Sequence, residues 1–361
     1  MYILTILGFI LGVGYLVITL TLKSTWRSIP SRLTPEDFLP KTSISVIIAA
    51  KNESTNIGLL LHHLFAQNYP KELVEFIIVN DHSTDDMLAQ IAKIDLPSNF
   101  HILNADKDFG KKAAITQGIG YAKGELIVTT DADCVMDTQW LQSIVWHYET
   151  KQPKFIASPV VFYQEKSFLE QFQSLDFLGM MLITGAGINS NKFYMANGAN
   201  MAFPKTIFEA VNGYEGNQHI ASGDDMFLVN KVAQQFPKGI QFNKNLDAVV
   251  QTRAESTWSR FFWQRIRWGS KNKSSNDVSL KLVLGWVFLT CLWLVLFLGL
   301  KLWVVVLLLK LIGDFFLLRE ASGYFKREKI MRIFLPAFLM HTVYISIIGV
   351  LSLLGQKVRW K

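Results

Sequence analysis

The feature that most constrains this chain is the placement of its uncharged segments near the two ends. Residues 2–22 contain no charged side chain, and a helix of that length crosses a bilayer core of about 30 Å. A cleaved signal peptide is the competing interpretation, but it requires a basic start, a shorter apolar core and a small-residue cleavage site, which this segment lacks. We therefore predict an uncleaved transmembrane helix at residues 1–23.

Three further apolar segments lie near the other end. Residues 282–300 are uncharged, residues 302–318 are interrupted by Lys310 and Asp314, and residues 333–355 form the last segment. The sequence thus predicts three transmembrane helices within residues 280–356 and four spans in total. Because Lys310 and Asp314 are one helical turn apart, they form either a functional polar site in the membrane or a structural contact between helices.

Basic residues beside the apolar segments predict the orientation. Residues 23–32 and 253–273 flank the polar middle of the chain and are rich in lysine and arginine, as is the loop at residues 319–332. The positive-inside rule places all three in the cytosol. We therefore expect an integral protein of the cell inner or plasma membrane with a cytosolic middle domain. The basic tail QKVRWK would then lie outside, which conflicts with the same rule. This conflict concerns the predicted number of spans rather than the predicted orientation.

The composition restricts the partners. The formal net charge is +7, and the basic residues lie beside the apolar segments, which suits membrane lipids with anionic head groups. The polar middle has no basic stripe interleaved with aromatic residues, so we predict no nucleic-acid partner. Two cysteines, Cys134 and Cys291, are too few for a disulfide framework or a zinc site.

Between residues 42 and 253 short apolar runs alternate with helix-like segments. Residues 44–50, 74–80, 100–104 and 125–130 are β-branched runs of strand length. This alternation predicts an α/β domain with a Rossmann-like, mostly parallel sheet. The strands are apolar throughout, which indicates a sheet covered on both faces.

Acidic side chains follow several of these predicted strands. The first ends in KNES, the second in NDHSTD and the fourth in DADCVMD. Such sheets bind ligands beyond the carboxyl ends of their strands. Helix capping explains the serines in these segments, but it does not explain Glu53, Asp81, Asp131 and Asp133 together.

Asp131 and Asp133 are two residues apart, so their charges repel unless a cation lies between them. Alternation along an extended chain would place both carboxylates on one side of the backbone. Hard oxygen ligands suit Mg²⁺ or Mn²⁺. We therefore predict a divalent metal cofactor held by these two residues.

Six short motifs occur in order along the chain: VIIAAKNES, VNDHSTD, GKKAA, DAD, GDD and QRIRW. Together they resemble the family-2 glycosyltransferases, on the membrane-synthase branch with D-x-D and Q-x-x-R-W motifs that includes cellulose, chitin and hyaluronan synthases and ceramide glucosyltransferase. The resemblance implies a cytosolic GT-A type domain at residues 42–253 with transmembrane helices at both ends. A D-x-D motif alone is weak evidence, because any acidic loop produces one; the order of six motifs is stronger.

The resemblance also implies where a nucleotide-sugar donor would bind. Glu53, Asp81, Lys112 and Asp131 would contact the nucleotide, with Asp81 on the base, and the metal would bridge the diphosphate. This chain has Asn80 and Asp81 where the family often has two aspartates. A solvated lysine pair is the alternative interpretation of the GKKAA lysines.

The GDD motif implies the catalytic base. By resemblance, Asp225 would take the proton from an acceptor hydroxyl as its oxygen attacks the anomeric carbon of the sugar. Asp224 stands where the family usually has glutamate and would support the reaction. A single displacement inverts the anomeric configuration. Helix capping is the structural alternative, and it would account for one of the two acids.

Residues 254–275 are predicted to form an amphipathic helix at the membrane interface. Gln264, Arg267 and Trp268 share one face of it, and aromatic residues line another side. The resemblance implies that Arg267 holds the diphosphate and that Trp268 packs against the acceptor, with Gln264 beside them. A position at the bilayer interface explains most of these residues without a catalytic role.

Two further segments have open interpretations. Residues 166–182 form either a second interfacial helix or a core helix. Residues 194–205 resemble an acceptor-side segment of the family, in which Gly198 would allow close approach of the backbone. An ordinary turn is the alternative for that segment.

The sequence therefore predicts a metal-dependent, inverting hexosyltransferase bound to the membrane. It would move a sugar from a nucleotide-sugar, with UDP as the expected nucleotide, to a lipid or glycan acceptor at the membrane. A processive polysaccharide synthase is an alternative, although a translocation channel needs more membrane helices. A polyprenyl-phosphate sugar synthase is another, although it needs no general base. A non-catalytic membrane scaffold gives no reason for acids at several strand ends.

Overall fold

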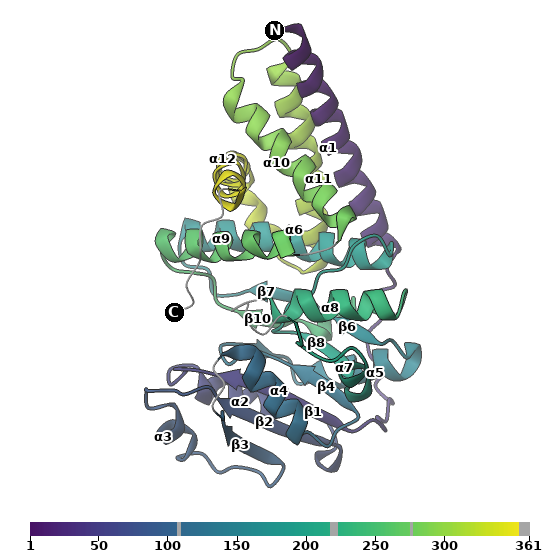
Figure 1. The fold of residues 1–361 in the computed structure, drawn as a ribbon, viewed down its shortest axis with the longest axis vertical. Helices are drawn as coiled ribbons and strands as arrows, with labels where there is room; N and C mark the ends of the chain where they lie inside the picture. Colours follow the sequence, from purple (N-terminus) through teal and green to yellow (C-terminus); the bar gives the residue numbers. More distant parts are fainter. Residues whose placement is uncertain (107–109, 217–222, 275–276, 354–361) are drawn as a thin grey trace. The chain divides into compact units, whose positions relative to one another are not determined.

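The computed structural model describes residues 1–106, 110–216, 223–274 and 277–353. The chain forms two compact units whose segments alternate along the sequence (Figure 1). The sheet unit comprises Pro30–Val161 and Met195–Arg253. The helical unit comprises Met1–Ile29, Phe162–Tyr194 and Ala254–Lys361. We describe each unit by itself.

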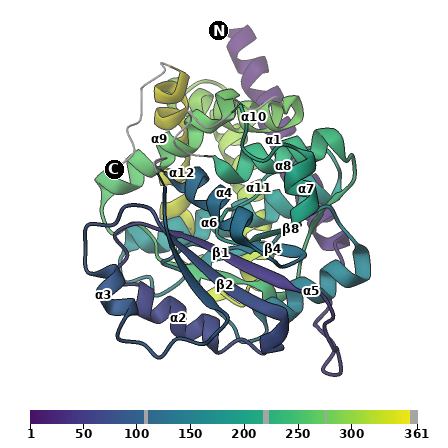
Figure 2. The same ribbon diagram turned by 60° about the horizontal axis from the view of Figure 1, so that its bottom comes forward.

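The large sheet has the strand order β3-β2-β1-β4-β8-β6-β9. All neighbouring strands are parallel except β8, which runs antiparallel to β4 and β6. The predicted mostly parallel sheet is confirmed, and Figure 2 shows β1 and β2 side by side in it. Its strands are β1 (Ile44–Ala50), β2 (Val74–Asn80), β3 (Phe100–Asn104), β4 (Leu126–Thr129), β6 (Phe155–Ala157), β8 (Met201–Pro204) and β9 (Ile240–Phe242).

A second, small sheet has the order β5-β10-β7, with β5 and β10 antiparallel. Its strands are β5 (Val135–Met136), β7 (Val160–Phe162) and β10 (Val250–Thr252). Strand β5 follows the D-x-D segment directly, so the small sheet anchors the loop that carries those acids.

Helices cover the large sheet because its strands are apolar on both faces. In α4, a Cβ on Gly118 would lie 2.7 Å from the Ile47 side chain of β1, so helix and sheet pack closely. The helical segments of this unit are α2 (Ile57–Phe65), η1 (Lys71–Leu73), α3 (Met87–Ile91), α4 (Lys111–Tyr121), α5 (Trp140–Lys151), α7 (Lys205–Ala210), α8 (Asp224–Gln235) and η2 (Leu246–Ala248).

The direction of β8 positions the candidate site. Because β8 is antiparallel to β4, the residues that precede β8 lie at the edge where β4 ends. Thr129, the last residue of β4, donates from Oγ1 to the carbonyl oxygen of Gly198 over 2.7 Å. The segment before β8 therefore joins the acidic strand ends that the sequence placed at this edge.

The helical unit consists of long helices. Helix α6 begins at a capping box, in which Ser167 accepts from the backbone of Glu170 and the Glu170 side chain accepts from the Ser167 backbone. Most of α6 is buried, which favours the core-helix interpretation of residues 166–182. The helices are α1 (Tyr2–Ser28), α6 (Phe168–Asn189), α9 (Trp258–Ser274), α10 (Val278–Leu296), α11 (Trp303–Tyr324), η3 (Glu328–Ile333) and α12 (Phe334–Leu353).

Within the described residues, three helical segments are long and apolar enough to cross a membrane: Tyr2–Ser28, Val278–Leu296 and Glu328–Leu353. They correspond to three of the four predicted spans. The fourth, α11, is helical as predicted but carries Lys310, Asp314, Arg319 and Glu320, and it is not among the three. Residue 275 of the predicted interfacial helix, residues 354–356 of the predicted membrane region and the rest of the tail lie outside the described residues.

Helices α1 and α11 lie side by side, whereas α12 is seen end-on in Figure 1. Lys310 is fully buried, and its Nζ lies 2.6 Å from Asp314 Oδ2 on the same helix. The hydroxyl of Tyr15 on α1 donates to the other oxygen of Asp314. The pair therefore joins α11 to α1, which supports its interpretation as a structural contact between helices.

Candidate active site

Three charged side chains from separate elements meet at the carboxyl edge of the large sheet. Lys111 in the first turn of α4 places Nζ 2.6 Å from Asp131 Oδ1 and 3.4 Å from Asp224 Oδ2. Burial lowers the pKa of Lys111, but the charges of Asp131 and Asp224 outweigh burial and raise the pKa well above its ordinary value. Lys111 is therefore a permanent cation that holds an acid from the end of β4 near an acid from the start of α8.

Gly198 lies directly against this cluster. A Cβ at this position would lie 2.7 Å from Asp224 Oδ2 and 3.1 Å from Lys111 Nζ. No side chain fits there unless one of these two groups moves. Gly198 therefore allows the backbone to approach these two groups closely, and it lies in a turn. An acceptor-side role of residues 194–205 stays a prediction.

Asp133 turns to a different partner. Its Oδ2 accepts a hydrogen bond of 3.0 Å from Thr252 Oγ1 on β10. Burial and the charge of Asp131 raise the pKa of the Asp133 carboxyl. The predicted extended geometry of the D-x-D segment is wrong: residues 132 and 133 form a turn, in which the Cys134 N–H donates to the Asp131 carbonyl over 3.2 Å. The turn sends the two carboxylates to different partners.

Glu53, which follows β1, belongs to the same electrostatic group. It is half-buried, and one of its oxygens accepts from Asn56 Nδ2 over 2.7 Å. Burial raises the pKa of the Glu53 carboxyl, and the charges of Asp133 and Asp131 raise it further. Burial first, and neighbouring acids second, thus disfavour the ionised form of Glu53 at this edge.

No group of three or more acidic, histidine or cysteine side chains in the described part of the chain has the arrangement of a complete metal site. The donors present are nevertheless of the right chemistry, since carboxylate oxygens are the ligands that Mg²⁺ and Mn²⁺ prefer. The raised pKa of Asp133 has the same cause that a cation would remove, namely burial beside another carboxylate. The residues fit a divalent ion that has its remaining ligands from a substrate.

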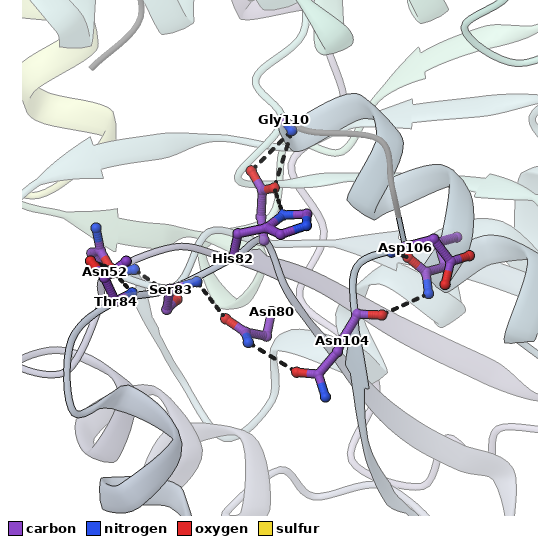
Figure 3. A network of polar contacts seen from close by, with 10 residues as sticks. Asn52, Asn80, His82, Ser83, Thr84, Asn104, Asp106 and Gly110 are labelled. Carbon is purple, nitrogen blue, oxygen red and sulfur yellow. Dashed lines mark hydrogen bonds and ion pairs between the residues drawn. The ribbon is translucent and has the colours of Figure 1, made fainter.

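Asp81 organises the start of α4. It is buried at the end of β2, and both of its oxygens accept from the Gly110 N–H at 3.1 Å. His82 Nδ1 also lies 3.1 Å from Asp81 Oδ1, and Figure 3 shows His82 and Gly110 on the same carboxylate. Asp81 therefore fixes the helix end that carries Lys111.

Asn80 has a structural task that an aspartate could not perform. Its Nδ2 donates to Asn104 Oδ1 over 3.0 Å, and its Oδ1 accepts from the Ser83 N–H over 3.1 Å (Figure 3). An ionised carboxylate only accepts hydrogen bonds. The amide therefore connects β2 to β3 and to the loop after β2, while the neighbouring acid remains directed at α4.

The two lysines of the GKKAA motif diverge. Lys111 reaches the carboxylates, whereas Lys112 is buried with its Nζ 4.6 Å from the ring centre of Phe227 on α8. The resemblance implies a nucleotide contact for Lys112, whereas Lys111 is the lysine that contacts Asp131 and Asp224. The helix period indicates that the two lysines have different partners, because adjacent residues on a helix point in different directions.

Asp225 lies beside the cluster in the first turn of α8. Its Oδ1 accepts from the Met226 N–H over 2.7 Å, and its charge contributes to the raised pKa of Lys111. The side chain is half-buried, whereas that of Asp224 is buried. Both acids of the GDD motif therefore lie at the edge that holds Asp131.

In the helical unit, the Q-x-x-R-W helix α9 is anchored by a residue that the sequence analysis did not select. Arg265 is buried, 3.3 Å from Asp176 of α6, with its guanidinium 4.4 Å from the ring centre of Trp268. The Trp268 ring also lies 5.8 Å from that of Phe177. The feature of the sequence that indicates such an ion pair is Asp176, an acidic residue within the apolar helix α6.

The other two residues of the motif are half-buried, as Trp268 is. Gln264 is half-buried, and its Nε2 donates to Glu255 Oε1 over 3.4 Å. Arg267 is also half-buried. Of the three predicted acceptor-side residues, Trp268 thus packs within the helical unit, against Arg265 of α9 and Phe177 of α6.

Part of the chain matches a known protein family. Residues 45–211 match the model of Glycosyl transferase family 2. The match includes β1 to β8, and with them Glu53, Asp81, Lys111, Asp131 and Gly198.

Two curated relatives cover part of the chain. The 4,4'-diaponeurosporenoate glycosyltransferase of Staphylococcus aureus (strain bovine RF122 / ET3-1) is 28% identical over 190 residues, which is 50% of this chain and 49% of that protein. The probable glycosyltransferase YdaM of Bacillus subtilis (strain 168) is 25% identical over 254 residues, 68% of this chain and 59% of that protein. The chain therefore spans about half to three fifths of the length of these relatives.

A solved structure resembles the whole chain. The mannosyltransferase PcManGT from Pyrobaculum calidifontis, in complex with GDP-Man and Mn²⁺, has a TM-score of 0.64 at 16% identity, with 98% of this chain and 99% of that chain covered. At this identity the likeness shows a shared fold. The predicted GT-A type fold is confirmed.

Proposed function

We propose that this protein is an inverting glycosyltransferase that moves a sugar from a nucleotide-sugar to a lipid acceptor at the membrane. The observation that carries the proposal is the cluster of Lys111, Asp131, Asp224 and Gly198 at the carboxyl edge of the sheet. All of these residues except Asp224 lie in the part of the chain that matches Glycosyl transferase family 2. Ligands of parallel α/β sheets bind at this edge.

Asp131 and Asp133 would hold a divalent metal ion, Mg²⁺ or Mn²⁺. The raised pKa of the Asp133 and Glu53 carboxyls, which are buried beside other acids, supports this assignment. So does the Mn²⁺ in the solved structure of similar fold. When bound, the metal would neutralise charge on the departing nucleoside diphosphate. Lys111 would supply a second positive charge on the same side, and Asp81 and Glu53 would contact the nucleotide.

The two acids of α8, Asp224 and Asp225, would have different roles. Asp224 pairs with Lys111 and would position it. Asp225 would accept the proton of the acceptor hydroxyl as the oxygen attacks the anomeric carbon. The two electrons of the sugar–phosphate bond leave with the nucleoside diphosphate, and attack from the opposite face inverts the configuration. Gln264, Arg267 and Trp268 would contact the acceptor or the diphosphate.

A lipid acceptor suits a chain with three helices long and apolar enough to cross a membrane among its described residues. One relative is named for transfer to 4,4'-diaponeurosporenoate, and the solved structure contains GDP-Man. The donor is therefore tested with both nucleotides, although UDP is the one expected from the sequence. The catalytic domain would face the cytosol, because basic residues flank it on both sides.

The test is nucleotide release from membranes that contain the full chain and a lipid extract, across a panel of UDP- and GDP-sugars. We expect release from one donor that requires a divalent metal and is lost in Asp225→Asn. Asp95→Asn, an exposed acid outside the cluster, is the matched control and should retain full activity. Metal-independent release would remove the assignment of Asp131 and Asp133.

The products distinguish the remaining alternatives. A ladder of product lengths would identify a processive synthase instead of a single transfer. Full activity of Asp225→Asn with a phosphorylated lipid would identify an acceptor that needs no base. Absence of both nucleotide binding and release, with every donor, would overturn the enzyme proposal in favour of a scaffold.

A further inference from the structure

A pocket opens between the last turns of α1 and α11 in the helical unit. Its volume is about 360 Å³, and its polar lining consists of Lys23 and Arg27 from α1 with Arg319 and Glu320 from α11. Lys23 is the first charged side chain after the apolar part of α1. The pocket therefore lies at the level where a spanning helix leaves the hydrocarbon core.

The lining has an excess of positive charge. Arg27 is paired with Glu320 through a hydrogen bond of 2.7 Å. Lys23 instead lies over an aromatic ring, with Nζ 4.8 Å from the centre of Phe316. Within the described part of the chain, no carboxylate forms an ion pair with Lys23 or Arg319. Two of the three cations thus lack a counter-ion among the described residues.

The pocket also has room for a ligand. A Cβ on Gly323, which lines it, would have no other atom within 4 Å. The ring of Tyr324 forms a wall beside this space and packs edge-on against Trp26, 5.1 Å between ring centres. The wall is therefore fixed from behind, and the space over Gly323 is open.

Exposed apolar stripes lead to the pocket along both helices. On α1, Val13, Val17 and Leu20 follow one another at helical spacing on the face that ends at Arg27. On α11, Leu308, Ile312 and Phe315 continue to Arg319 in the same way. Unpaired basic groups at one end of an apolar surface match the two parts of a phospholipid, a phosphate head group and acyl chains.

We propose that this pocket binds the phosphate head group of an anionic phospholipid, with the acyl chains along the exposed stripes of α1 and α11. Arg319 and Lys23 provide the charge, and Arg319 can contact two phosphate oxygens at once. A soluble phosphate would find the same cations, but it would make no use of the apolar stripes. The site shares no residue with the acidic cluster, and its test does not depend on glycosyl transfer.

The experiment measures lipid binding to the purified full chain in detergent by native mass spectrometry. The probes are phosphatidylglycerol, which is anionic, phosphatidylcholine, which is zwitterionic, and soluble glycerol phosphate. We expect retention of phosphatidylglycerol over phosphatidylcholine. Arg319→Gln and Lys23→Gln should each weaken it about fivefold, the factor that corresponds to roughly 1 kcal/mol per basic residue.

Matched variants separate a built site from general surface charge. Lys329→Gln removes the same charge from an exposed position in η3, outside the pocket, and should leave retention unchanged. Gly323→Glu places a carboxylate in the open space and should abolish the preference, whereas Gly323→Gln tests its size alone and should keep most of it. Circular dichroism of each variant checks that the helices are intact.

Three outcomes would overturn the proposal. Equal retention of the two lipids would show that the pocket has no preference for anionic head groups. Equal losses in Lys329→Gln and Arg319→Gln would indicate diffuse attraction to the basic surface. Displacement of the lipid by glycerol phosphate at equal concentration would identify a soluble-anion site instead.

Discussion

Two lysines, one in each unit, show how differently this chain uses a cation beside carboxylates. Lys111 joins acids from separate elements, and its side chain is 24% exposed while that of Asp131 is 34% exposed. Lys310 pairs within one helix with Asp314 and is 0% exposed. The first arrangement is open at a sheet edge, so a ligand can replace Lys111 as the partner of these carboxylates. The second is enclosed, so the ion pair contributes to the packing of α11 on α1.

The largest expected difference is in catalysis. Asp225→Asn should lower turnover by about 10²- to 10⁴-fold, because a positioned base contributes that much, while the thermal unfolding of the protein stays nearly unchanged. The measurement is nucleotide release together with a melting curve in detergent. A large fall in melting temperature would mean that the open cluster is structural after all.

The enclosed pair should respond in the opposite way. Lys310→Met leaves Asp314 buried without its cation, and we expect a loss of about 3–5 kcal/mol in the free energy of unfolding. The double variant Lys310→Met/Asp314→Leu removes both charges and should recover most of that loss. If the double variant were no more stable than the single one, the cost would come from packing rather than from an unpaired charge.

A half-buried histidine provides the third case. Burial lowers the pKa of His147 on α5 to about 4. The folded state therefore prefers the neutral ring, so its contribution to stability is complete above the unfolded pKa of about 6.5 and is lost as the pH falls toward 4. We expect a loss of up to about 3 kcal/mol over this interval, measured by hydrogen exchange of the α5 amides.

His147→Gln is the control for this pH dependence, because it removes the titrating group and keeps a polar side chain. The slope between pH 6.5 and 4 should become smaller in that variant. An unchanged slope would assign the acid sensitivity of the sheet unit to other groups.

The smallest expected effect tests how tightly the open cluster is packed. Gly198→Ala places a methyl group 2.7 Å from Asp224 Oδ2, and the resulting displacement of Asp224 or Lys111 should lower turnover about tenfold, in line with overpacking costs of roughly 1–3 kcal/mol. Gly120→Ala in α4 meets no atom within 4 Å and serves as the control. Equal activity of the two variants would show that the cluster tolerates a displaced acid.

Much of the sheet unit was readable from the sequence, because β-branched runs of strand length have few alternatives. Strands β1, β2 and β3 begin and end where the apolar runs do. The acids after β1, β2 and β4 also lie at one edge, as parallel strands require. The local geometry of Asp131 and Asp133 was not readable, because a turn of two residues depends on what β5 and β10 hold in place.

In the helical unit the sequence predicted the helices but not their partners. Periodicity locates α9 and its Q-x-x-R-W face, yet the ion pair that anchors it joins Arg265 to Asp176, 89 positions earlier in the chain. The basic pocket likewise needs α1 and α11 side by side, although almost 300 residues separate Lys23 from Arg319. No local pattern contains such contacts.

The sequence by itself determined the types of element, the acidic edge of the sheet and the apolar segments, since each follows from hydrophobic periodicity and charge within a few residues. The tertiary structure alone decided that Lys111 joins Asp131 to Asp224, that Gly198 has no room for a side chain, and that Tyr15 of α1 contacts the Lys310–Asp314 pair. Each of these depends on which surfaces of distant elements come into contact, and burial and pairing of charges are properties of that contact.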